Sequence, residues 1–478
     1  MNTRADNHEK LFSFLKGSTI LIISNIFLKA INFFLLPLYT NNLTPSMLGV
    51  SDSITTMTGF ILPLLTLGLD SAYSAFYFEK NNPDRGKNVY STLSFVFFML
   101  GIVPLLFLFT CPSISALLFH TKKYSLEVML SFLTVAVNLW FLPYSLEIRL
   151  KNRILAFGMV NMIASVSMLM LNILFVSVLK IGELSLILSA MIIGIEQLIL
   201  FSSIVKSKPK RRDFKLDLLK DMLRFSVPMV PSVIMMWVLS LSDRYVILYF
   251  CGEAAVGIYG IGLRFTHLLN VIVNGISTAY TTYAFSSHED QSAKEQYYYI
   301  FNITSIVLLL ISFTTGLYGK EIISLMTEKA YLSSYRILRD MMFAQSFYAM
   351  STIISYGIFF EKKSVYSLIA VSFASITNLL LNLALIPKYG IDAAAATTLI
   401  GYLIHLTISY YYSERLYPCN YGIKRIGVIS FLMYIISLLF LEKAFLIKTF
   451  VWVFVLGLVF YLYRNLLYKL ISFIRQLT

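Results

Sequence analysis

Residues Leu381–Leu403, LNLALIPKYGIDAAAATTLIGYL, consist of an apolar run, a short polar turn and a second apolar run. The turn holds Pro387 and Gly390, and both residue types interrupt helices. A helix needs about 20 mostly apolar residues to cross the hydrocarbon of a membrane. The stretch therefore predicts the end of one membrane-spanning helix, a tight turn and the start of the next.

The alternation of apolar runs and short turns extends over all 478 residues. The chain is 58% hydrophobic and 13% charged with a mean hydropathy of +0.74, whereas soluble proteins contain about 25% charged residues. No long polar stretch remains for a separate soluble domain. We predict an all-α integral membrane protein with about fourteen transmembrane helices. The predicted spans are residues 18–39, 47–78, 88–110, 124–145, 154–179, 184–205, 225–250, 254–286, 296–318, 337–360, 364–386, 391–412, 426–441 and 449–471.

The net charge of +14 comes from 39 basic residues against 25 acidic ones. The basic residues lie mainly in loops between apolar runs, which suits a membrane protein better than one that binds nucleic acid. With a cytoplasmic N-terminus, 26 of the 39 fall on the cytoplasmic side and 9 outside, so both termini are predicted to be cytoplasmic. The first apolar run is too long for a cleavable signal. Cys111, Cys251 and Cys419 have no paired spacing that would indicate disulfides or a metal site.

Glycines recur at one offset along the chain. Gly49 and Gly257 are 208 positions apart, as are Gly182 and Gly390, and each pair occupies the same place in successive sets of six spans. Because six is even, both sets insert in the same orientation, which predicts two parallel six-helix repeats. The predicted domains are an N-lobe of helices 1–6 (residues 1–206), a basic cytoplasmic linker (207–224), a C-lobe of helices 7–12 (225–413) and helices 13–14 (414–478).

The linker begins with the most basic segment of the chain, KSKPKRRDFK at Lys206–Lys215. Clusters of this kind orient membrane proteins and can also bind anionic lipid headgroups. We interpret the segment as an orientation signal and as a hinge between the halves, in preference to a specific lipid site.

Four basic residues cannot be placed in or beside a loop: Lys29, Arg244, Arg264 and Arg339. A cation in hydrocarbon costs about 2.5–3.5 kcal/mol even on lenient scales, so it usually faces a cavity, a partner or a substrate. Lys29 and Arg264 lie at similar depths in spans that run in opposite directions. An arginine fork and a mobile lysine charge at one depth would suit a diphosphate or an acidic sugar.

Polar residues gather on one face of the first, second and eighth predicted helices. Beyond the basic residues, the second helix has such a face from Asp52 through Thr56 to Asp70. A face exposed to lipid would leave these groups unsatisfied, so we predict that the three faces meet water, protein or cargo. The candidate substrate-binding residues are Lys29, Arg264, Asn25, Asn32, His267 and Asn274.

Alternative roles remain open for several of these residues. Lys29 could pair with Asp52 instead of with substrate, since the two lie within about one helical turn in depth. His267 fits an ordinary hydrogen-bonding residue better than a protonation switch. Arg339 and Asp340 are expected at the lipid headgroups.

No nucleotide-binding loop, metal-ligand spacing or nucleophile motif is present in the sequence, so no cofactor and no enzymatic activity are predicted. Transport would then draw on a gradient, with H⁺ or Na⁺ coupling at an intramembrane carboxylate. Asp70, near the cytoplasmic interface, suits a lobe-closing role. The candidate gating or ion-coupling residues are Asp52, Asp70, Asp243 and Arg244.

Four stretches carry a resemblance to a known family, and the resemblance extends over nearly the whole chain, from the first predicted helix to at least the twelfth. Besides Leu381–Leu403 they are LTPSMLGV with TLGLDSAYSAFYFE (43–50 and 66–79), EIRLKNRILAFGMVN (147–161) and SDRYVILYFCGEAAVGIYGIGLRF (242–265). These stretches resemble the polysaccharide-exporter branch of the multidrug/oligosaccharidyl-lipid/polysaccharide (MOP) superfamily, whose members include the Wzx-type O-antigen or capsule repeat-unit flippases.

The resemblance implies a MATE/MurJ-like, V-shaped cavity lined by helices 1, 2, 7 and 8, in a bacterial inner membrane. It implies flipping of an undecaprenyl-pyrophosphate-linked oligosaccharide by alternating access, with helices 13 and 14 beside the lipid tail. Membrane lipid, a polysaccharide polymerase and chain-length machinery are the implied partners. The family pattern includes the Asp243–Arg244 pair, which we interpret either as a gating or headgroup contact or as structural pairing.

Two related functions stay open. A multidrug cation antiporter of the same superfamily would have an acidic or aromatic cavity, which Lys29 and Arg264 disfavour. A lipid II flippase would share the fold and a cationic cavity, and the sequence does not separate it from an oligosaccharide flippase by any residue pattern. No spacing of residues in the sequence indicates which sugar the protein would bind.

Overall fold

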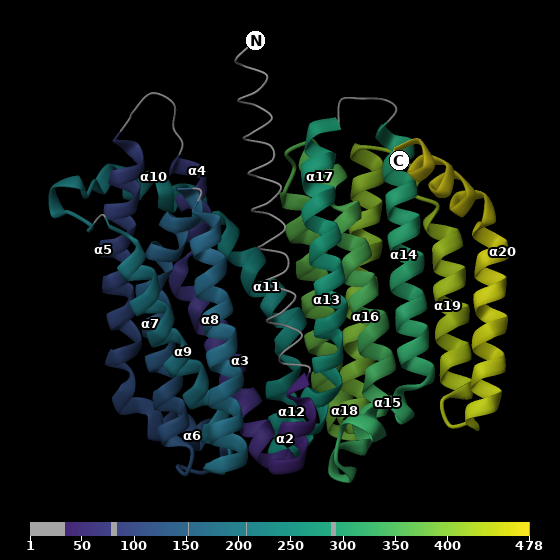
Figure 1. The fold of residues 1–478 in the computed structure, drawn as a ribbon, viewed down its shortest axis with the longest axis horizontal. Helices are drawn as coiled ribbons and strands as arrows, with labels where there is room; N and C mark the ends of the chain where they lie inside the picture. Colours follow the sequence, from purple (N-terminus) through teal and green to yellow (C-terminus); the bar gives the residue numbers. More distant parts are fainter. Residues whose placement is uncertain (1–33, 78–83, 152, 207, 288–292, 478) are drawn as a thin grey trace. The chain divides into compact units, whose positions relative to one another are not determined.

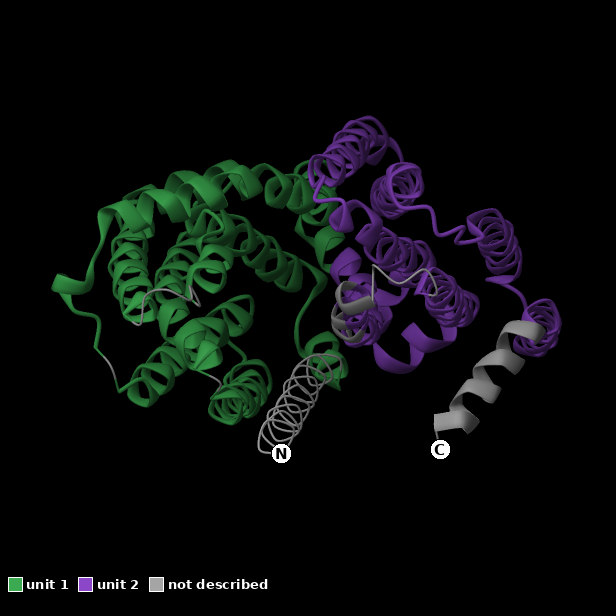
Figure 2. Ribbon diagram, turned by 90° about the horizontal axis from the view of Figure 1, so that it is seen from above, with its two compact units in different colours: residues 1–257 green, residues 258–478 purple. Residues whose placement is uncertain are grey.

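The computed structural model describes residues 34–77, 84–151, 153–206, 208–287 and 293–477, and these residues form helices and connecting turns without a strand (Figure 1). The prediction of an all-α fold is confirmed. The chain forms two compact units, unit 1 (residues 1–257) and unit 2 (residues 258–478), coloured separately in Figure 2. The predicted repeats, V-shaped cavity and domain boundaries stay predictions.

Unit 1 is a bundle in which α7 packs against α3, α5 and α9. Its elements in chain order are α2 (Leu36–Asn42), α3 (Pro45–Thr66), α4 (Leu69–Tyr77), α5 (Arg85–Leu106), the 3-10 turn η1 (Leu108–Thr110), α6 (Cys111–Phe119), α7 (Ser125–Leu150), α8 (Ile154–Asn172), the π-helical η2 (Ile173–Val178), α9 (Leu184–Ile204), η3 (Arg211–Asp213), α10 (Leu216–Ser226), η4 (Val227–Met229), α11 (Val230–Leu241) and α12 (Asp243–Cys251).

Unit 2 is built around α16, which packs against α14 and α18, while α19 packs against α14. The remaining elements are α13 (Glu253–Ser287, which begins in unit 1), α14 (Ala293–Leu317), α15 (Gly319–Met326), η5 (Lys329–Ser334), α16 (Tyr335–Ile354), α17 (Tyr356–Phe360), α18 (Val365–Leu416), α19 (Ile423–Phe440) and α20 (Phe445–Leu477).

Within the described residues, 11 helices are long and apolar enough to cross a membrane. Three places account for the difference from the fourteen expected. Most of the first predicted span lies outside the described residues, α16 contains Arg336, Arg339 and Asp340 in its first turns, and α18 is a single element of 52 residues. The count of fourteen therefore stays a prediction.

The long helix α18 contains the predicted turn at Pro387 and Gly390. A straight helix of 52 residues would measure about 78 Å, more than twice the hydrocarbon thickness of about 30 Å. Gly390 breaks it with φ 62° and ψ −142°, three residues after Pro387. The positive φ is the conformation that glycine adopts without strain. Pro387 and Gly390 thus divide α18 at the place that the sequence predicted.

The second predicted span does not continue as one helix. Leu67 and Gly68 both have positive φ, and they separate α3 from α4. A side chain at Gly68 would come within 3.2 Å of the carbonyl oxygen of Ser226, at the end of α10. Asp70 therefore lies in the first turn of α4 and does not extend the polar face of α3, which corrects the expectation of one continuous face.

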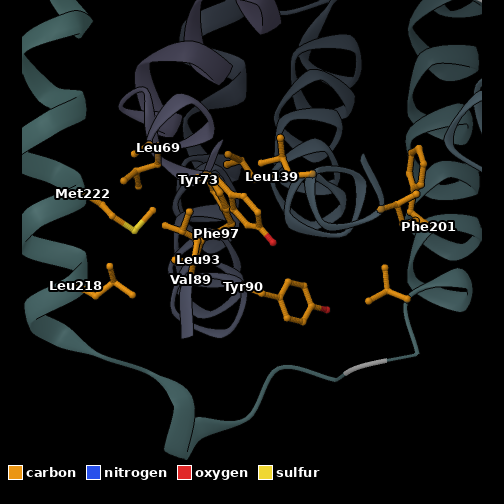
Figure 3. Packing of buried hydrophobic residues seen from close by; sticks show 14 of the residues in the cluster. Leu69, Tyr73, Val89, Tyr90, Leu93, Phe97, Leu139, Phe201, Leu218 and Met222 are labelled. Atoms are coloured by element: carbon orange, nitrogen blue, oxygen red, sulfur yellow. The ribbon is translucent and has the colours of Figure 1, made fainter. Parts of the chain in front are cut away.

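The linker predicted between the halves is partly helical and packs on unit 1. Leu218 and Met222 of α10 are buried in the unit 1 core, where Figure 3 shows them facing Leu69 of α4 and Val89 and Leu93 of α5. The exposed residues of α10 include Asp217, Lys220, Asp221 and Arg224, so the helix is amphipathic. Apolar burial holds this segment against the end of the bundle.

Two of the sequence landmarks meet in space. A Cβ on Gly49 of α3 would lie 1.7 Å from the carbonyl oxygen of Glu253, and one on Gly257 of α13 would lie 2.0 Å from that of Pro45. No side chain fits at either distance, so the backbones of the two helices touch here. These glycines are required by close approach and not by their backbone angles.

A buried ion pair on α16 is linked by a hydrogen bond to α19 in unit 2. Arg339 and Asp340, 8% and 5% exposed, form a pair with Nε and Oδ1 2.7 Å apart, and Tyr434 of α19 donates a hydrogen bond of 3.0 Å to the same carboxylate oxygen. The two residues pair with each other inside the protein, and their expected position at the level of the headgroups stays a prediction. Tyr434 lies against the guanidinium, 5.1 Å from ring to cation, and shields the pair.

Candidate functional site

Part of the predicted site lies outside the described residues. Asn25, Lys29 and Asn32 belong to residues 1–33, so the polar face of the first helix and the Lys29–Asp52 pair stay predictions. The other candidates occupy two places: Asp52, Asp70, Asp243 and Arg244 in unit 1, and Arg264, His267 and Asn274 in unit 2.

In unit 1, Arg244 lies against the polar face of α3. Its Nη1 donates a hydrogen bond of 3.2 Å to Thr56 Oγ1, and Thr56 Oγ1 in turn donates one of 2.7 Å to the carbonyl oxygen of Asp52. Next to it, the hydroxyl of Tyr245 donates to the carbonyl oxygen of Ser53 at 3.3 Å. The structure therefore brings Arg244 to the turn of α3 that contains Asp52 and Thr56, two members of the predicted polar face.

Asp243 has a different environment from its neighbour. It is 1% exposed, and its Oδ1 accepts a hydrogen bond of 2.8 Å from the backbone N–H of Arg244 in the first turn of α12. This contact satisfies an N–H that has no partner within the helix. Asp243 therefore fixes the start of α12, while Arg244 points its guanidinium to α3.

Aromatic packing holds α11 and α12 on α3. The rings of Phe60 and Trp237 lie 4.5 Å apart, and those of Trp237 and Tyr245 lie 6.0 Å apart. Within the described chain the buried Nε of Arg244 donates no hydrogen bond. A guanidinium that donates a single hydrogen bond to a neutral hydroxyl has further N–H groups with which it can bind an anion.

In unit 2, the candidates on α13 lie on its more exposed side. His267 and Asn274 are exposed and Arg264 is half-buried, whereas Phe265 and Leu269 are buried on the opposite side. This pattern agrees with the polar face expected from the spacing. The binding roles of the three residues are not tested by these positions and stay predictions.

One polar cluster was missed by the sequence argument. Glu196 lies at the thirteenth position of α9, about 18 Å from its first residue at 1.5 Å per residue, and accepts a hydrogen bond of 2.8 Å from Ser167 of α8. The adjacent Gln197 donates to Asn161 at 3.2 Å. The pair Glu196–Gln197 interrupts an otherwise apolar run and was therefore readable in the sequence. The sequence prediction considered only Asp52, Asp70 and Asp243 as intramembrane carboxylates. An intramembrane carboxylate is a default candidate for function.

Comparison with known proteins adds a family and a fold. The profile of the family described as Polysaccharide biosynthesis protein matches residues 14–287, more than half of the chain, and that of the family described as MatE matches residues 228–384. No curated protein sequence matches the chain.

Several solved structures have a similar fold. The lipid II flippase MurJ in an inward closed conformation has a TM-score of 0.72 at 18% identity, covering 95% of this chain and all of its own (100%). An inward-facing multidrug resistance MATE transporter gives 0.64 at 17% identity, covering 84% and 95%. A MOP superfamily transporter from Pyrococcus furiosus gives 0.58 at 15% identity, covering 86% and 96%. At these identities the likeness establishes the fold alone.

The family match and the fold agree with the many apolar helices of a multi-pass integral membrane protein. The matched family and the similar structures are those of transporters and flippases, not enzymes. The chain is therefore a member of the family described as Polysaccharide biosynthesis protein.

Proposed function

We propose that the protein flips an undecaprenyl-pyrophosphate-linked oligosaccharide repeat unit from the cytoplasmic to the external leaflet of a bacterial inner membrane. The main support is the match to the polysaccharide biosynthesis family over residues 14–287. The fold supports it as well, since a lipid II flippase superposes over nearly the whole of both chains. Both termini would be cytoplasmic, as the distribution of basic residues predicts.

The proposed mechanism is alternating access with the lipid tail kept in the bilayer. The charged headgroup would enter from the cytoplasmic side, where Lys29 and Arg264 would attract its diphosphate or acidic sugars. The guanidinium of Arg244, which donates to a neutral hydroxyl on α3, would offer further hydrogen bonds to the headgroup. Binding through several cations that face cargo would offset the cost of moving a charged headgroup through hydrocarbon.

The energy source belongs to the proposal as well. No cofactor is proposed, and H⁺ or Na⁺ coupling would use Asp52, Asp70 or Asp243. Glu196, hydrogen-bonded to Ser167 within the helices, is a further candidate that the structure adds. A polysaccharide polymerase and chain-length machinery would use the product on the external side.

A lipid II flippase is the second candidate, and the likeness to MurJ favours it. The two functions share a polyprenyl diphosphate and differ in the sugars attached to it. A multidrug antiporter is the third, because the MatE family profile matches residues 228–384. The cationic residues in the helices of this chain suit anionic cargo better than cationic drugs.

Lipid extraction from cells depleted of the protein distinguishes these functions. Accumulation of one undecaprenyl-pyrophosphate oligosaccharide with loss of surface polysaccharide would support the proposal and identify the repeat unit. Accumulation of lipid II together with cell lysis would indicate instead that the protein flips lipid II for peptidoglycan synthesis. Unchanged lipids with greater drug sensitivity would overturn both flippase functions.

A further inference from the structure

A cavity of about 410 Å³ opens within unit 1 between α5, α7 and α9. This volume is within the range of ligand sites, about 300–1,000 Å³. Four of its eight lining residues are aromatic, and one of these, Phe98, is 51% exposed, so the cavity is open to the surroundings of the bundle. The lining residues include Phe95, Phe98, Trp140, Tyr144, Leu198 and Pro209.

The aromatic wall is held in place. Trp140 Nε1 donates a hydrogen bond of 3.2 Å to the carbonyl oxygen of Phe98, and the two rings stack at 6.1 Å. Gly101 makes room for the indole, because a Cβ there would lie 2.2 Å from Trp140 Nε1. A wall of fixed rings presents apolar surface without the entropy cost of ordering flexible chains.

The basic linker passes over one end of this cavity and is fixed there. The backbone N–H of Lys210 donates to Ser91 Oγ at 3.3 Å, and that of Lys215 donates to Thr92 Oγ1 at 3.1 Å. Phe214 packs edge-on against Phe95 at 6.3 Å, and α10 continues into the unit 1 core (Figure 3). The segment interpreted from sequence as a hinge is therefore attached to the end of α5.

The linker brings an excess of exposed positive charge to the cavity. Pro209, which lines the cavity, lies between Lys208 and Lys210 in the chain. Asp213 is the one acidic residue of the segment, and it lies 3.6 Å from the 76% exposed Arg212. The exposed cations of the segment are Lys206, Lys208, Lys210, Arg211, Arg212 and Lys215.

We propose that this cavity and the linker form a binding site for an anionic phospholipid of the leaflet on the linker's side. An acyl chain would occupy the aromatic cavity, and the headgroup phosphate would lie among the linker cations. Apolar walls next to a surplus of cations suit an amphiphilic anion, whereas a zwitterionic lipid gains little from the cations. The site does not depend on which cargo the protein transports.

The three tryptophans of the chain allow a direct test. The full-length protein with Trp237→Phe and Trp452→Phe keeps Trp140, in the cavity wall, as its fluorophore. It is reconstituted in phosphatidylcholine vesicles that contain either phosphatidylglycerol or phosphatidylcholine with brominated acyl chains. We expect brominated phosphatidylglycerol to quench Trp140 at a mole fraction several-fold lower than brominated phosphatidylcholine.

Removal of the cations provides the second arm. Arg211→Gln and Arg212→Gln together should reduce the preference for phosphatidylglycerol, by about 5-fold for each cation that contacts the headgroup. The matched control is Lys362→Gln with Lys363→Gln, which removes two cations from the turn before α18 and should leave the preference unchanged. Circular dichroism checks that helix content is equal in all variants.

Three results would overturn the proposal. The first is equal quenching by the two brominated lipids, and the second is a preference for phosphatidylglycerol that survives loss of Arg211 and Arg212. The third is displacement of brominated phosphatidylglycerol by an equimolar amount of a polyprenyl diphosphate, which would assign the cavity to the lipid carrier instead.

Discussion

Positive charge on the helices has different partners in two regions of the molecule. In unit 2, Arg339 pairs with Asp340, and Lys448 of α20, 1% exposed, contacts both carboxylate oxygens of Glu321 at 2.8 and 2.9 Å. In unit 1, the guanidinium of Arg244 meets the neutral hydroxyl of Thr56. A cation matched by a carboxylate holds helices together, whereas a cation matched by a hydroxyl keeps charge for an anion. The comparison separates structural cations from candidates for cargo binding.

The largest effect is expected on α13, at the predicted cargo cation. Arg264→Ala should abolish flipping while the protein remains inserted, because a neutral methyl group offers no partner to a diphosphate. Arg264→Lys should restore part of the activity if charge alone matters. The measurement is the amount of surface polysaccharide in cells that express each variant at equal level. Normal polysaccharide with Arg264→Ala would contradict the cationic-site hypothesis.

Arg244 tests the unit 1 side of the comparison. Arg244→Ala should lower the flipping rate at least about 10-fold, the value of one charge-assisted hydrogen bond, with little change in thermal stability. Externalised lipid-linked oligosaccharide in reconstituted vesicles measures the rate. Arg336→Ala is the control, since Arg336 is 60% exposed and lies 3.9 Å from Asp392. A large loss of stability with unchanged flipping would place Arg244 among the structural cations.

Substitution of Lys448 tests whether a cation paired with a carboxylate stabilises the fold. Lys448→Met should destabilise the fold by about 2 kcal/mol, less than for a fully buried pair because Glu321 remains 36% exposed. The second substitution Glu321→Gln should recover part of this loss, since it removes the unmatched charge. Thermal unfolding in detergent measures both variants. If the single and double variants are equally unstable, the ion pair does not account for the effect.

The smallest effect concerns the turn between α19 and α20. Tyr335 and Lys320 donate hydrogen bonds to Glu442 and lower the pKa of its carboxyl below the usual 4.5. Because the pKa is lower in the folded state, the stabilisation is complete above the usual value and is lost as the pH falls through the lowered one. Glu442 and Lys320 are 56% and 46% exposed, so water screens the contact.

Comparison of wild type with Glu442→Gln measures this effect. The difference in melting temperature should be present at about pH 6 and should shrink as the pH falls below the usual pKa of Glu442, about 4.5, because its carboxylate is then progressively protonated. A difference that stays constant over this range would show that ionisation of Glu442 does not contribute.

The elements that local sequence determines were predicted well. Pro387 and Gly390 interrupt α18 where expected, because proline and glycine act on their own backbone. Asn382 in the family-like stretch is fully buried and its Nδ2 donates to Asn378 Oδ1 at 3.1 Å. A stretch that identifies the family thus includes a packing residue.

Features that depend on distant residues were not predictable. The break at Gly68 lies against Ser226 at the end of α10, and the pair of Arg339 and Asp340 is contacted by Tyr434 of α19. Neither partner is a neighbour in sequence. Glu196 differs, since it was readable in the sequence and was overlooked. For the site, spacing predicted the exposed polar side of α13, but the contact between Arg244 and Thr56 joins two helices that no local pattern connects.

The burial of α10 has a consequence for biosynthesis. The core of unit 1 is complete only after Leu218 and Met222 have been added, well past the sixth predicted span. A nascent chain that has just inserted its first six helices therefore still exposes the apolar surface around Leu69 and Leu93. During that interval the N-terminal bundle is the part of the chain most open to chaperones and proteases. Truncation after residue 206 should yield a protease-sensitive fragment, and truncation after residue 226 a more resistant one.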